Sequence, residues 1–546
     1  MRYPDLKQRS STGVKRNDML KLYDTTLRDG GQREGVSLTV DDKLRITARL
    51  DALGIDFIEG GFPGSNATDR LYFEQLQTLS LKHAEVTAFG MTTRKGVKPE
   101  NDEGMKALAE CAAQTITLVG KACEVHARKV LEASAQENHW MISESIKFLR
   151  KKKKRVFFDA EHYFDSFLIN QNYALATLDT AYRAGAEVLI LCDTNGGSLP
   201  GDVFEITRTT INTLQSMGID AVVGIHAHND TGCAIANSLE AVRAGATHIQ
   251  GTVNGYGERV GNADILTLMA NIQLKIGIKI VLDEQLAQLT SVSRFVSETF
   301  NIHHDAYLPY VGQNAFSHKG GLHAGAAMRY KHAYEHIDPA VVGNFSHIVV
   351  SELAGKSSLI TKANELGIKL PKEDTEVREL LNTIKMRESL GYSYEVADAS
   401  LSLLLRAETG SNVECFTLES FRVIAEKRED GRVISEATIK LLVGDERHVA
   451  TGEGNGPVNA LDAALRLAIH KFYPQVEKLE LTDYKVRVLD ASTGTAAVTR
   501  VLIETSDGSS TWGTIGVSDN VIEASWNALV DAITYGLMIV GKNQHA

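Results

Sequence analysis

Two histidines spaced two residues apart are the clearest chemical signal in this sequence. His226 and His228 stand in the run AVVGIHAHND, whose apolar start is typical of a β-strand. Because alternate residues of a strand point to the same side, both imidazoles should face one space. An aspartate at the end of another strand would complete a set of nitrogen and oxygen donors that favours a divalent metal ion. The set has no thiolate, so Mg²⁺ or Mn²⁺ fits it as well as Zn²⁺ does.

Other polar residues follow apolar runs in the same way. Arg28 and Asp29 end the run KLYDTTLRD, just before two glycines. Further runs end in polar residues at Asp159 and Glu161, at Asp193, Thr194 and Asn195, and at His226 to Asp230. In α/β enzymes the carboxyl ends of parallel strands commonly carry the chemistry. One such end alone could be a solvated strand terminus, and one histidine alone a core residue, so the inference depends on the whole pattern.

Eight strand-like runs alternate with helix-like segments from Lys21 to about Leu286. These runs are KLYDTTLRD, DFIEGGFPG, EVTAFGMT, QTITLVG, RVFFDAEH, EVLILCDTNG, AVVGIHAHND and HIQGTVNG. In TVDDKLRITARLDALG, residues Ile46, Leu50 and Leu53 fall on one helical face, and Gly54 supplies a stop. Eight such units predict an α/β protein with a (β/α)8 TIM barrel. The competing doubly wound sheet has little support, because no GxGxxG motif opens a helix after the first strand.

Composition excludes several classes of partner. A chain of 546 residues predicts two or three domains, and 43% hydrophobic with 23% charged residues is typical of a soluble globular protein. The net charge of -11, without a long basic face, argues against nucleic acid. We expect no membrane partner and a cytoplasmic location, because no signal peptide or run of about twenty apolar residues is found. Five cysteines without CxxC spacing predict reduced thiols.

The last third of the chain contains a repeat. GEGNGPVNALDAAL from Gly452 aligns with GVSDNVIEASWNAL from Gly516, 64 residues later, and strand-like runs precede both. This pattern predicts a C-terminal α+β domain of two βββα units, after a helical linker such as TEVRELLNTIKMRESLG. We expect a barrel at 1–290, a helical linker at 291–400 and the repeats at 401–546. The two turns either hold a carboxylate at a helix N-terminus or simply cap their helices; the candidate residues are Gly454, Asn455, Gly456, Ser518, Asp519 and Asn520.

Three motifs together resemble a known enzyme family. TLRDGGQ, HAHND and GERVGN, in this order, resemble the metal-dependent acyl-CoA condensing enzymes, namely the 2-isopropylmalate, homocitrate and citramalate synthases. The similarity covers nearly the whole chain. YDTTLRDGGQ with EGGFPGSN, and DYKVRVLD with GTAAVTRVLIE, are most similar to the citramalate synthase branch. HxH alone would be a weak signal; the order of the motifs is a strong one.

The resemblance implies roles for individual residues. The implied metal ligands are Asp29, His226, His228 and Asn262; Arg28 and Thr194 would hold a 2-keto acid, and Glu161 would act as an acid/base or orienting group. Glu258 would order the ligands and water from behind, and Asp230 would either do the same for His228 or cap its turn. SHKGGLHAGAAMRYKHAYEHIDP is similar to the segment that closes over the active site, with His323 and Tyr334 as catalytic residues that reach a partner subunit. Here Lys319 replaces the acid of the common HESGIHQDG motif, which weakens the transfer of neighbouring contacts.

The implied reaction is a Claisen condensation of acetyl-CoA with a 2-keto acid, followed by thioester hydrolysis. In the citramalate branch the keto acid is pyruvate, which needs a small pocket; Phe62, after the second strand, is one candidate for the required bulk. The repeats would bind isoleucine, or leucine, at the interface of a homodimer. The alternatives are 2-isopropylmalate or homocitrate synthase, a lyase or aldolase of the wider barrel superfamily, and an inactive amino-acid sensor. The intact set Arg28, Asp29, His226, His228 and Asn262 argues against the sensor.

Overall fold

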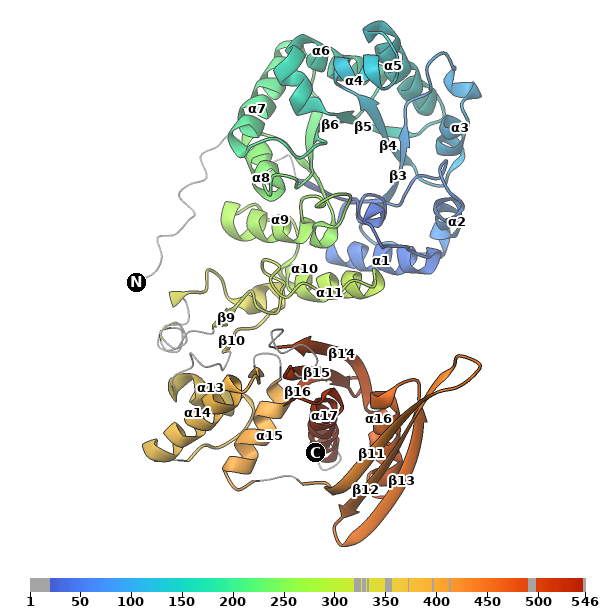
Figure 1. The fold of residues 1–546 in the computed structure, drawn as a ribbon. Helices are drawn as coiled ribbons and strands as arrows, with labels where there is room; N and C mark the ends of the chain where they lie inside the picture. The colour runs from blue at the N-terminus through green and yellow to red at the C-terminus, as the bar shows by residue number, and fades with distance from the viewer. Residues whose placement is uncertain are drawn as a thin grey trace. The chain divides into compact units, whose positions relative to one another are not determined.

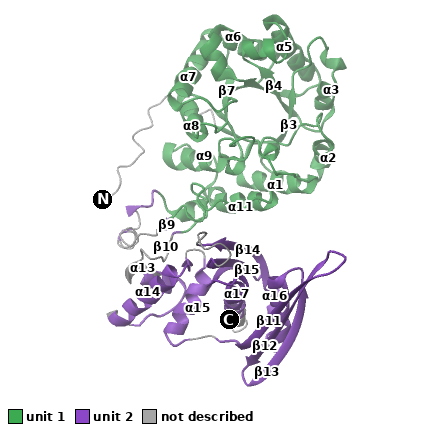
Figure 2. Cartoon of the chain, viewed as in Figure 1, with its two compact units in different colours: residues 1–316, 337–345 green, residues 317–336, 346–546 purple. Residues whose placement is uncertain are grey.

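The computed structural model describes residues 20–318, 326, 330, 333–348, 356–371, 373–394, 397–411, 414–489 and 497–543. The chain divides into two compact units, drawn in two colours in Figure 2. Residues up to Phe316 and Ile337–Phe345 belong to the first unit, and Ser317–His336 and Ser346–Ala546 to the second. Among the described residues, no helix is long and apolar enough to cross a membrane. All five cysteines are free.

Eight parallel strands close into a barrel in the first unit (Figure 1). The strands are β1 Lys21–Asp24, β2 Phe57–Glu59, β3 Glu85–Met91, β4 Thr115–Lys121, β5 Arg155–Glu161, β6 Val188–Asp193, β7 Val222–Ala227 and β8 His248–Gly251. Each strand pairs with its neighbours in the sequence, and β1 pairs with β8 to close the ring, which places Tyr23 beside both Phe57 and Gln250. The predicted TIM barrel is confirmed.

Helices surround the barrel because each presents one apolar face to the strands. They are α1 Val40–Leu53, α2 Ala67–Gln75, α3 Glu103–Glu110, α4 Glu124–Lys129, α5 Ala135–Lys151, α6 Tyr163–Ala184, α7 Pro200–Ser216, α8 Ala234–Ala244, α9 Ile265–Asn271, α10 Asp283–Leu286 and α11 Leu289–Thr299. In α1, the predicted face of Ile46, Leu50 and Leu53 is buried. A capping box at Thr39 begins this helix, and Gly54 with φ 91° ends it, as predicted.

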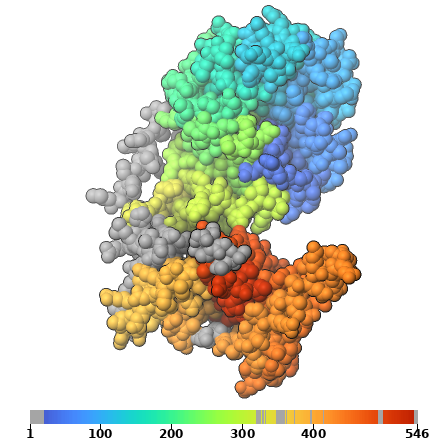
Figure 3. All heavy atoms as spheres, in the orientation of Figure 1, coloured from blue at the N-terminus to red at the C-terminus, as the bar shows by residue number. Residues whose placement is uncertain are grey.

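The inside of the barrel is packed with side chains. Tyr23, Phe157, Val188, Ile190 and Cys192 form a buried cluster on the strands, with Phe57 packed against it. Figure 3 accordingly shows atoms across the ring that Figure 1 draws open. Catalytic chemistry in such a barrel is confined to the ends of the strands and to the innermost polar side chains.

The first unit continues beyond the barrel itself. Asn254, which follows β8, donates hydrogen bonds from Nδ2 to the carbonyl oxygen of Ser293 and to Ser297 Oγ on α11, at 3.0 Å each. Helix α11 therefore packs with the barrel, although our expected barrel limit was residue 290. The limits at 290 and 400 stay predictions.

The second unit contains the two predicted βββα repeats. Its elements are β9 Ser317–His318, β10 His347–Ile348, α13 Lys356–Glu365, α14 Asp374–Ser389, α15 Asp398–Glu408, β11 Thr417–Lys427, β12 Val433–Val443, β13 Glu446–Gly454, α16 Pro457–Ile469, β14 Glu480–Val488, β15 Thr499–Ser506, β16 Thr511–Ser518 and α17 Val521–Asn543. Strands β11–β13 form one antiparallel sheet and β14–β16 another (Figure 1). The α+β repeat architecture is confirmed.

Candidate active site

The first predicted ligands come together at the end of the barrel strands. Asp29, His226 and His228 are buried, and one donor atom from each lies within 4.8 Å of the others. His226 Nε2 lies 3.3 Å from His228 Nε2 and 3.3 Å from Asp29 Oδ2. Strand β7 ends at Ala227, one residue before His228. The alternation of the strand still places both imidazoles on one side, as the spacing predicts.

Asn262 joins these three residues through a tight glycine loop. Its Nδ2 lies 3.3 Å from both Asp29 Oδ2 and His226 Nε2, while its Oδ1 is buried and has no hydrogen-bond partner among the described residues. The oxygen and nitrogen ends of a side-chain amide have nearly the same shape. Rotating the Asn262 amide by 180° would therefore point the lone pairs of Oδ1 at Asp29 and His226. Gly261 adopts φ 98°, and a Cβ there would meet the carbonyl oxygen of Gly255 at 1.9 Å. The loop therefore needs glycine to bring Asn262 into place.

We call Asp29, His226, His228 and Asn262 the ligand cluster. Burial, with His226 next in importance, lowers the pKa of His228 to about 3, so its ring is neutral. Burial disfavours the charge of Asp29, but Arg28 and the two histidines outweigh it and hold the pKa of this carboxyl below its ordinary value. Buried lone pairs that face one another repel unless a cation lies between them. The donor set, neutral imidazoles with a carboxylate and an amide, therefore fits a divalent metal ion.

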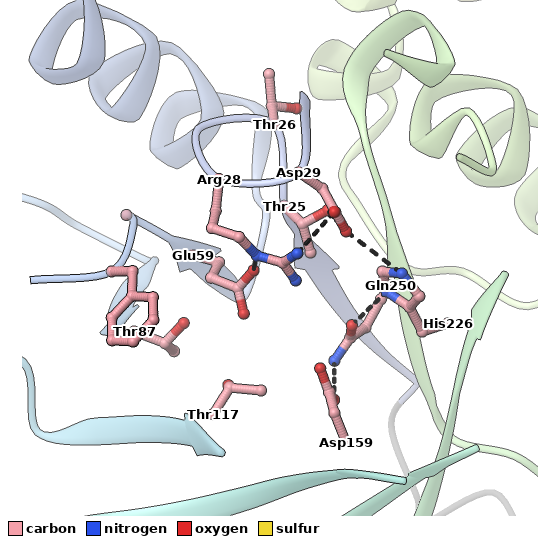
Figure 4. A network of polar contacts seen from close by, with 12 residues as sticks. Thr25, Thr26, Arg28, Asp29, Glu59, Thr87, Thr117, Asp159, His226 and Gln250 are labelled. Carbon is pink, nitrogen blue, oxygen red and sulfur yellow. Dashed lines mark hydrogen bonds and ion pairs between the residues drawn. The ribbon is translucent and has the colours of Figure 1, made fainter. Parts of the chain in front are cut away.

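Arg28 lies beside the cluster and is fixed on three sides. Its Nη1 donates to Asp29 Oδ1 at 2.6 Å, its Nε donates to Glu59 Oε2 at 2.5 Å, and its guanidinium stacks 4.0 Å from the centre of the Phe89 ring. Figure 4 shows Arg28 between these two carboxylates. Strand β1 ends at Asp24, earlier than we expected, because the Asp24 carboxylate accepts from both N and Oγ1 of Thr26 and turns the chain.

Glu59 connects Arg28 to a second group of buried polar residues. Tyr23 donates from its hydroxyl to Glu59 Oε1 at 2.7 Å, and this hydroxyl also lies 2.8 Å from Thr87 Oγ1 and 2.5 Å from Thr117 Oγ1. Burial raises the pKa of Tyr23 well above its ordinary value, so the hydroxyl stays protonated and can donate. Sequence reasoning missed these residues. The only available signal was an acid, Glu59, inside the apolar run DFIEGG.

Gln250 and Asp159 extend the buried polar group on the other side. Gln250 Oε1 lies 2.7 Å from His226 Nδ1, and Gln250 Nε2 donates to Asp159 Oδ1 at 3.2 Å (Figure 4). Burial raises the pKa of Asp159 well above its ordinary value, and the charge of Glu59 adds to this effect. We call the whole group the strand network, because its members all stand on barrel strands: Tyr23, Glu59, Thr87, Thr117, Asp159 and Gln250.

Comparison with known proteins agrees with this geometry. Residues 19–296 match the HMGL-like family, 310–389 the homocitrate synthase post-HMGL domain-like family, and 395–537 the LeuA allosteric (dimerisation) domain. An (R)-citramalate synthase of Streptomyces coelicolor is 48% identical over 96% of this chain and 98% of its own length. One of Synechocystis is 48% identical over 95% and 96%. The chain belongs to the (R)-citramalate synthase family. A probable 2-isopropylmalate synthase of Methanopyrus kandleri is more distant, at 30% identity over 94% of this chain and 98% of its own.

HMGL-like enzymes generally depend on a divalent metal, so the ligand cluster is where such dependence would arise in this family member. The structure gives other partners to the remaining candidates near the barrel mouth. Glu161 Oε2 forms an ion pair with Lys121 Nζ at 2.5 Å. Thr194 Oγ1 accepts from the backbone N–H of His162 at 2.8 Å, and His162 adopts a left-handed φ of 58°. Both residues stand at strand ends, as predicted, and neither role is tested by these contacts.

Asp230 and Glu258 were expected to order the ligands. Instead, Asp230 accepts two hydrogen bonds from Arg259, at 2.7 and 2.9 Å, and Arg259 also donates to the carbonyl oxygen of Thr194 at 2.9 Å. His228 Nδ1, which Asp230 could have held, is buried without a hydrogen-bond partner in the described part of the chain. Glu258 is exposed. Arg259, which we had not singled out, thus ties the loops after β6 and β7 together.

The remaining catalytic candidates are His323 and Tyr334. His323 is outside the described residues, and Tyr334 belongs to the second unit, where its side chain is half exposed. Their roles stay predictions.

In both candidate effector turns, side chains of the turn or the helix accept hydrogen bonds from the backbone. Asn520 Oδ1 accepts from the backbone N–H groups of Ile522 and Glu523, and Ser518 Oγ accepts from the N–H of Asn520. In the first repeat, Asn459 Oδ1 accepts from the N–H of Asn455, between Gly454 and Gly456. A side chain therefore caps α17, whereas Gly456 at the start of α16 offers no side-chain cap. Whether Asp519 and its neighbours also bind an effector stays a prediction.

A hollow of about 420 Å³ opens beside Arg28. Its lining includes Arg28, Lys43, Phe62, Asn66, Asp69 and Phe89. Phe62 and Phe89 meet edge to face, with ring centres 6.0 Å apart. The hollow thus has an aromatic wall next to the positive charge of Arg28, which suits an acyl group whose carbonyl must approach a cation.

Proposed function

We propose that this chain condenses acetyl-CoA with pyruvate and hydrolyses the thioester, which gives (R)-citramalate and CoA. The observation that carries the proposal is the gap in similarity: five relatives named (R)-citramalate synthase are 42–48% identical, whereas the 2-isopropylmalate synthases compared are 28–30% identical. The geometry of the ligand cluster and Arg28 supports an active enzyme and not a sensor that has lost its catalytic residues.

The ligand cluster would hold a divalent metal, with Mn²⁺ or Mg²⁺ favoured by its mixed nitrogen and oxygen donors and Zn²⁺ as the alternative. When bound, the metal would supply Lewis-acid polarisation of the ketone carbonyl of the keto acid. Asp29, His226, His228 and Asn262 would provide the donor atoms.

Arg28 would stabilise the negative charge that develops on the ketone oxygen. Glu59 and Asp29 fix the plane of its guanidinium, so its remaining N–H groups reach the substrate without a cost in side-chain entropy. Thr194 would hold the carboxylate of the keto acid through its hydroxyl proton, because its oxygen already accepts from His162. The acetyl methyl must lose a proton before its carbon attacks the ketone, and Glu161 is one candidate base. His323 with Tyr334 is the other.

The strand network supports a small keto acid. Tyr23 with its partners Glu59, Thr87 and Thr117 occupies the barrel interior beneath Arg28, and all four are buried. A branched side chain on the keto acid would have to displace this network, whereas the methyl of pyruvate would not. The hollow lined by Phe62 and Phe89 would then receive the thioester end of acetyl-CoA.

The second unit would regulate the barrel. Its LeuA-type domain would form a homodimer and bind isoleucine, the end product expected for a citramalate synthase, with leucine as the alternative. The turns Gly454–Gly456 and Ser518–Asn520 would hold the carboxylate of the amino acid through backbone N–H groups other than those already bonded to Asn459, Ser518 and Asn520.

The test measures thiol release from acetyl-CoA with pyruvate, 2-ketoisovalerate and 2-ketoglutarate, each with Mn²⁺ and with a chelator. We expect release with pyruvate, its loss on chelation and its recovery on adding Mn²⁺ or Mg²⁺. Preference for 2-ketoisovalerate or 2-ketoglutarate would instead assign 2-isopropylmalate or homocitrate synthesis. Release with none of the three would refute the substrate assignment. Inhibition by isoleucine but not leucine, in the same assay, tests the effector.

A further inference from the structure

His226 has a hydrogen-bond partner on the side that faces away from the ligand cluster. Its Nδ1 lies 2.7 Å from Gln250 Oε1, and both side chains are buried. An amide oxygen can only accept, so Nδ1 must carry the ring proton. The other nitrogen, Nε2, then presents a lone pair to Asp29, His228 and Asn262. A metal ligand requires this tautomer.

The orientation of the Gln250 amide decides which tautomer forms. A half-turn of the amide would present its NH₂ to His226 Nδ1, and the ring proton would move to Nε2, where it would occupy the ligand position. Asp159 opposes this half-turn. Its Oδ1 accepts from Gln250 Nε2 at 3.2 Å, so turning the amide would break this hydrogen bond in the interior of the barrel.

His228 provides an internal contrast. Its Nδ1 is buried without a hydrogen-bond partner in the residues that the structure describes. Its ring is neutral, because burial lowers its pKa to about 3, but nothing described fixes its tautomer. The fold therefore controls the proton of one imidazole of the pair.

We propose that Gln250 and Asp159 are positioning residues that hold His226 in the tautomer able to bind a divalent cation. Neither touches the substrate; Asp159 orients the amide, and the amide orients the proton. The inference rests on the proposed metal site, and it adds two residues from β8 and β5 to those that the family motifs contain.

The test is Mn²⁺ affinity of the full chain, stripped of metal and measured from the EPR signal of free Mn²⁺ at neutral pH. We expect Gln250→Leu, which removes the acceptor, to weaken binding by about 10–100-fold, the usual effect of losing a ligand's outer partner. Gln250→Glu keeps an acceptor and should stay within about threefold of the original chain, with its extra proton shared with Asp159. Asp159→Leu should weaken binding by about tenfold, and Asp159→Asn, which keeps an oxygen acceptor, should rescue it.

Thr210→Val is the matched control. It removes an equally buried hydrogen bond, from Thr210 Oγ1 to the hydroxyl of Tyr163 at 2.8 Å, without touching the strand network. We expect it to lower the melting temperature but to leave Mn²⁺ affinity unchanged.

Three outcomes distinguish the tautomer inference from a merely structural role of these residues and from the absence of a metal site. Leucine variants that bind Mn²⁺ as the original chain does would overturn the inference and leave the metal site standing. Leucine and conservative variants that lose affinity in parallel would also overturn it, because a merely structural role predicts no rescue. An original chain that binds no Mn²⁺, Mg²⁺ or Zn²⁺ would instead refute the proposed site. If Gln250→Leu does not fold, the two Asp159 variants decide between the same outcomes.

Discussion

The ligand cluster and the strand network lie side by side in the barrel, yet only one of them could be predicted from sequence. Residues of the cluster follow strand ends and recur in short motifs, whereas those of the network stand singly inside apolar strands. The two groups are joined by Arg28, which contacts Asp29 and Glu59, and by Gln250, which contacts His226. The cluster supplies the donor atoms, and the network holds them in one orientation and one protonation state.

Breaking the cluster should have the largest effect. We expect Asp29→Asn to lower kcat/KM by about 10³-fold or more, because it removes the negative charge of a ligand and the ion pair with Arg28 Nη1 together. Mn²⁺ binding, measured by equilibrium dialysis, should fall in the same variant. Asp179→Asn is a suitable control, since this partly buried acid pairs with Arg183 on α6 and belongs to neither group. Full activity in Asp29→Asn would place the metal elsewhere.

Weakening the link that Arg28 forms between the two groups should lower activity by less. Arg28→Lys keeps the positive charge, but a lysine ammonium cannot bind Glu59 and Asp29 in one plane and also face the substrate. We expect kcat to fall by about 10²-fold with a smaller change in the KM for pyruvate.

Arg33→Lys, on the same loop, is the matched control for Arg28→Lys. Arg33 lies over the Tyr256 ring at 5.2 Å and contacts neither group. Equal activity losses in the two variants would show that the loop, and not the guanidinium of Arg28, matters.

The difference between the two groups also explains how much of the site could be predicted from the sequence. The HxH spacing predicted that His226 and His228 converge, and the closed barrel explains why Asp29 meets them from the first strand. No comparable rule predicts that the Tyr23 hydroxyl contacts the hydroxyls of Thr87 and Thr117. These contacts depend on the register of strands that are far apart in the sequence. Asp230 shows the opposite limit: it lies beside a ligand in sequence, and its ion pair with Arg259 could not be predicted from that position.

The second unit gives the same lesson. Both repeats were predicted from a spacing of 64 residues, but their outer sheet faces differ. Ile515 and Val517 pack with the helices α13–α15, while the aligned residues of the first repeat, Thr451 and Glu453, are exposed. Strand periodicity distinguishes the two faces of a sheet but does not say which helix covers the outer one.

A smaller change inside the strand network should have a smaller effect. Tyr23→Phe removes the hydroxyl that donates to Glu59, so we expect a loss of about 1–2 kcal/mol in the free energy of unfolding. Because Glu59 holds Arg28, kcat should also fall several-fold. Tyr72→Phe is the control: its hydroxyl, equally buried, contacts Thr47 at 2.8 Å and no member of the network. A kcat that falls equally in both variants would contradict a link between network and cluster.

The smallest effect concerns the turn that places Arg28 and Asp29. Asp24 accepts from Thr26, whose Oγ1 also accepts from the backbone N–H of Val253, so the carboxyl joins the loops after β1 and β8. Burial, against the two hydrogen bonds from Thr26, raises the pKa of Asp24 from 3.8 to about 7. A carboxyl whose pKa is higher in the folded protein than in the unfolded chain stabilises the protein fully at pH values below its unfolded-state pKa. This stabilisation is lost as pH rises through the folded-state pKa. The window is therefore pH 3.8 to about 7.

Asp24→Asn cannot ionise, so it should gain stability relative to the original chain as pH rises through this window, and the difference should level off above it. Urea midpoints of both proteins at several pH values measure this difference. Asp102→Asn should show the opposite sign at acid pH, because backbone and side-chain hydrogen bonds from Arg94 and Met105 outweigh burial and hold the pKa of Asp102 below its ordinary value. A stability difference for Asp24→Asn that does not change with pH would mean that folding does not raise the pKa of this carboxyl, which would contradict its burial in an uncharged form.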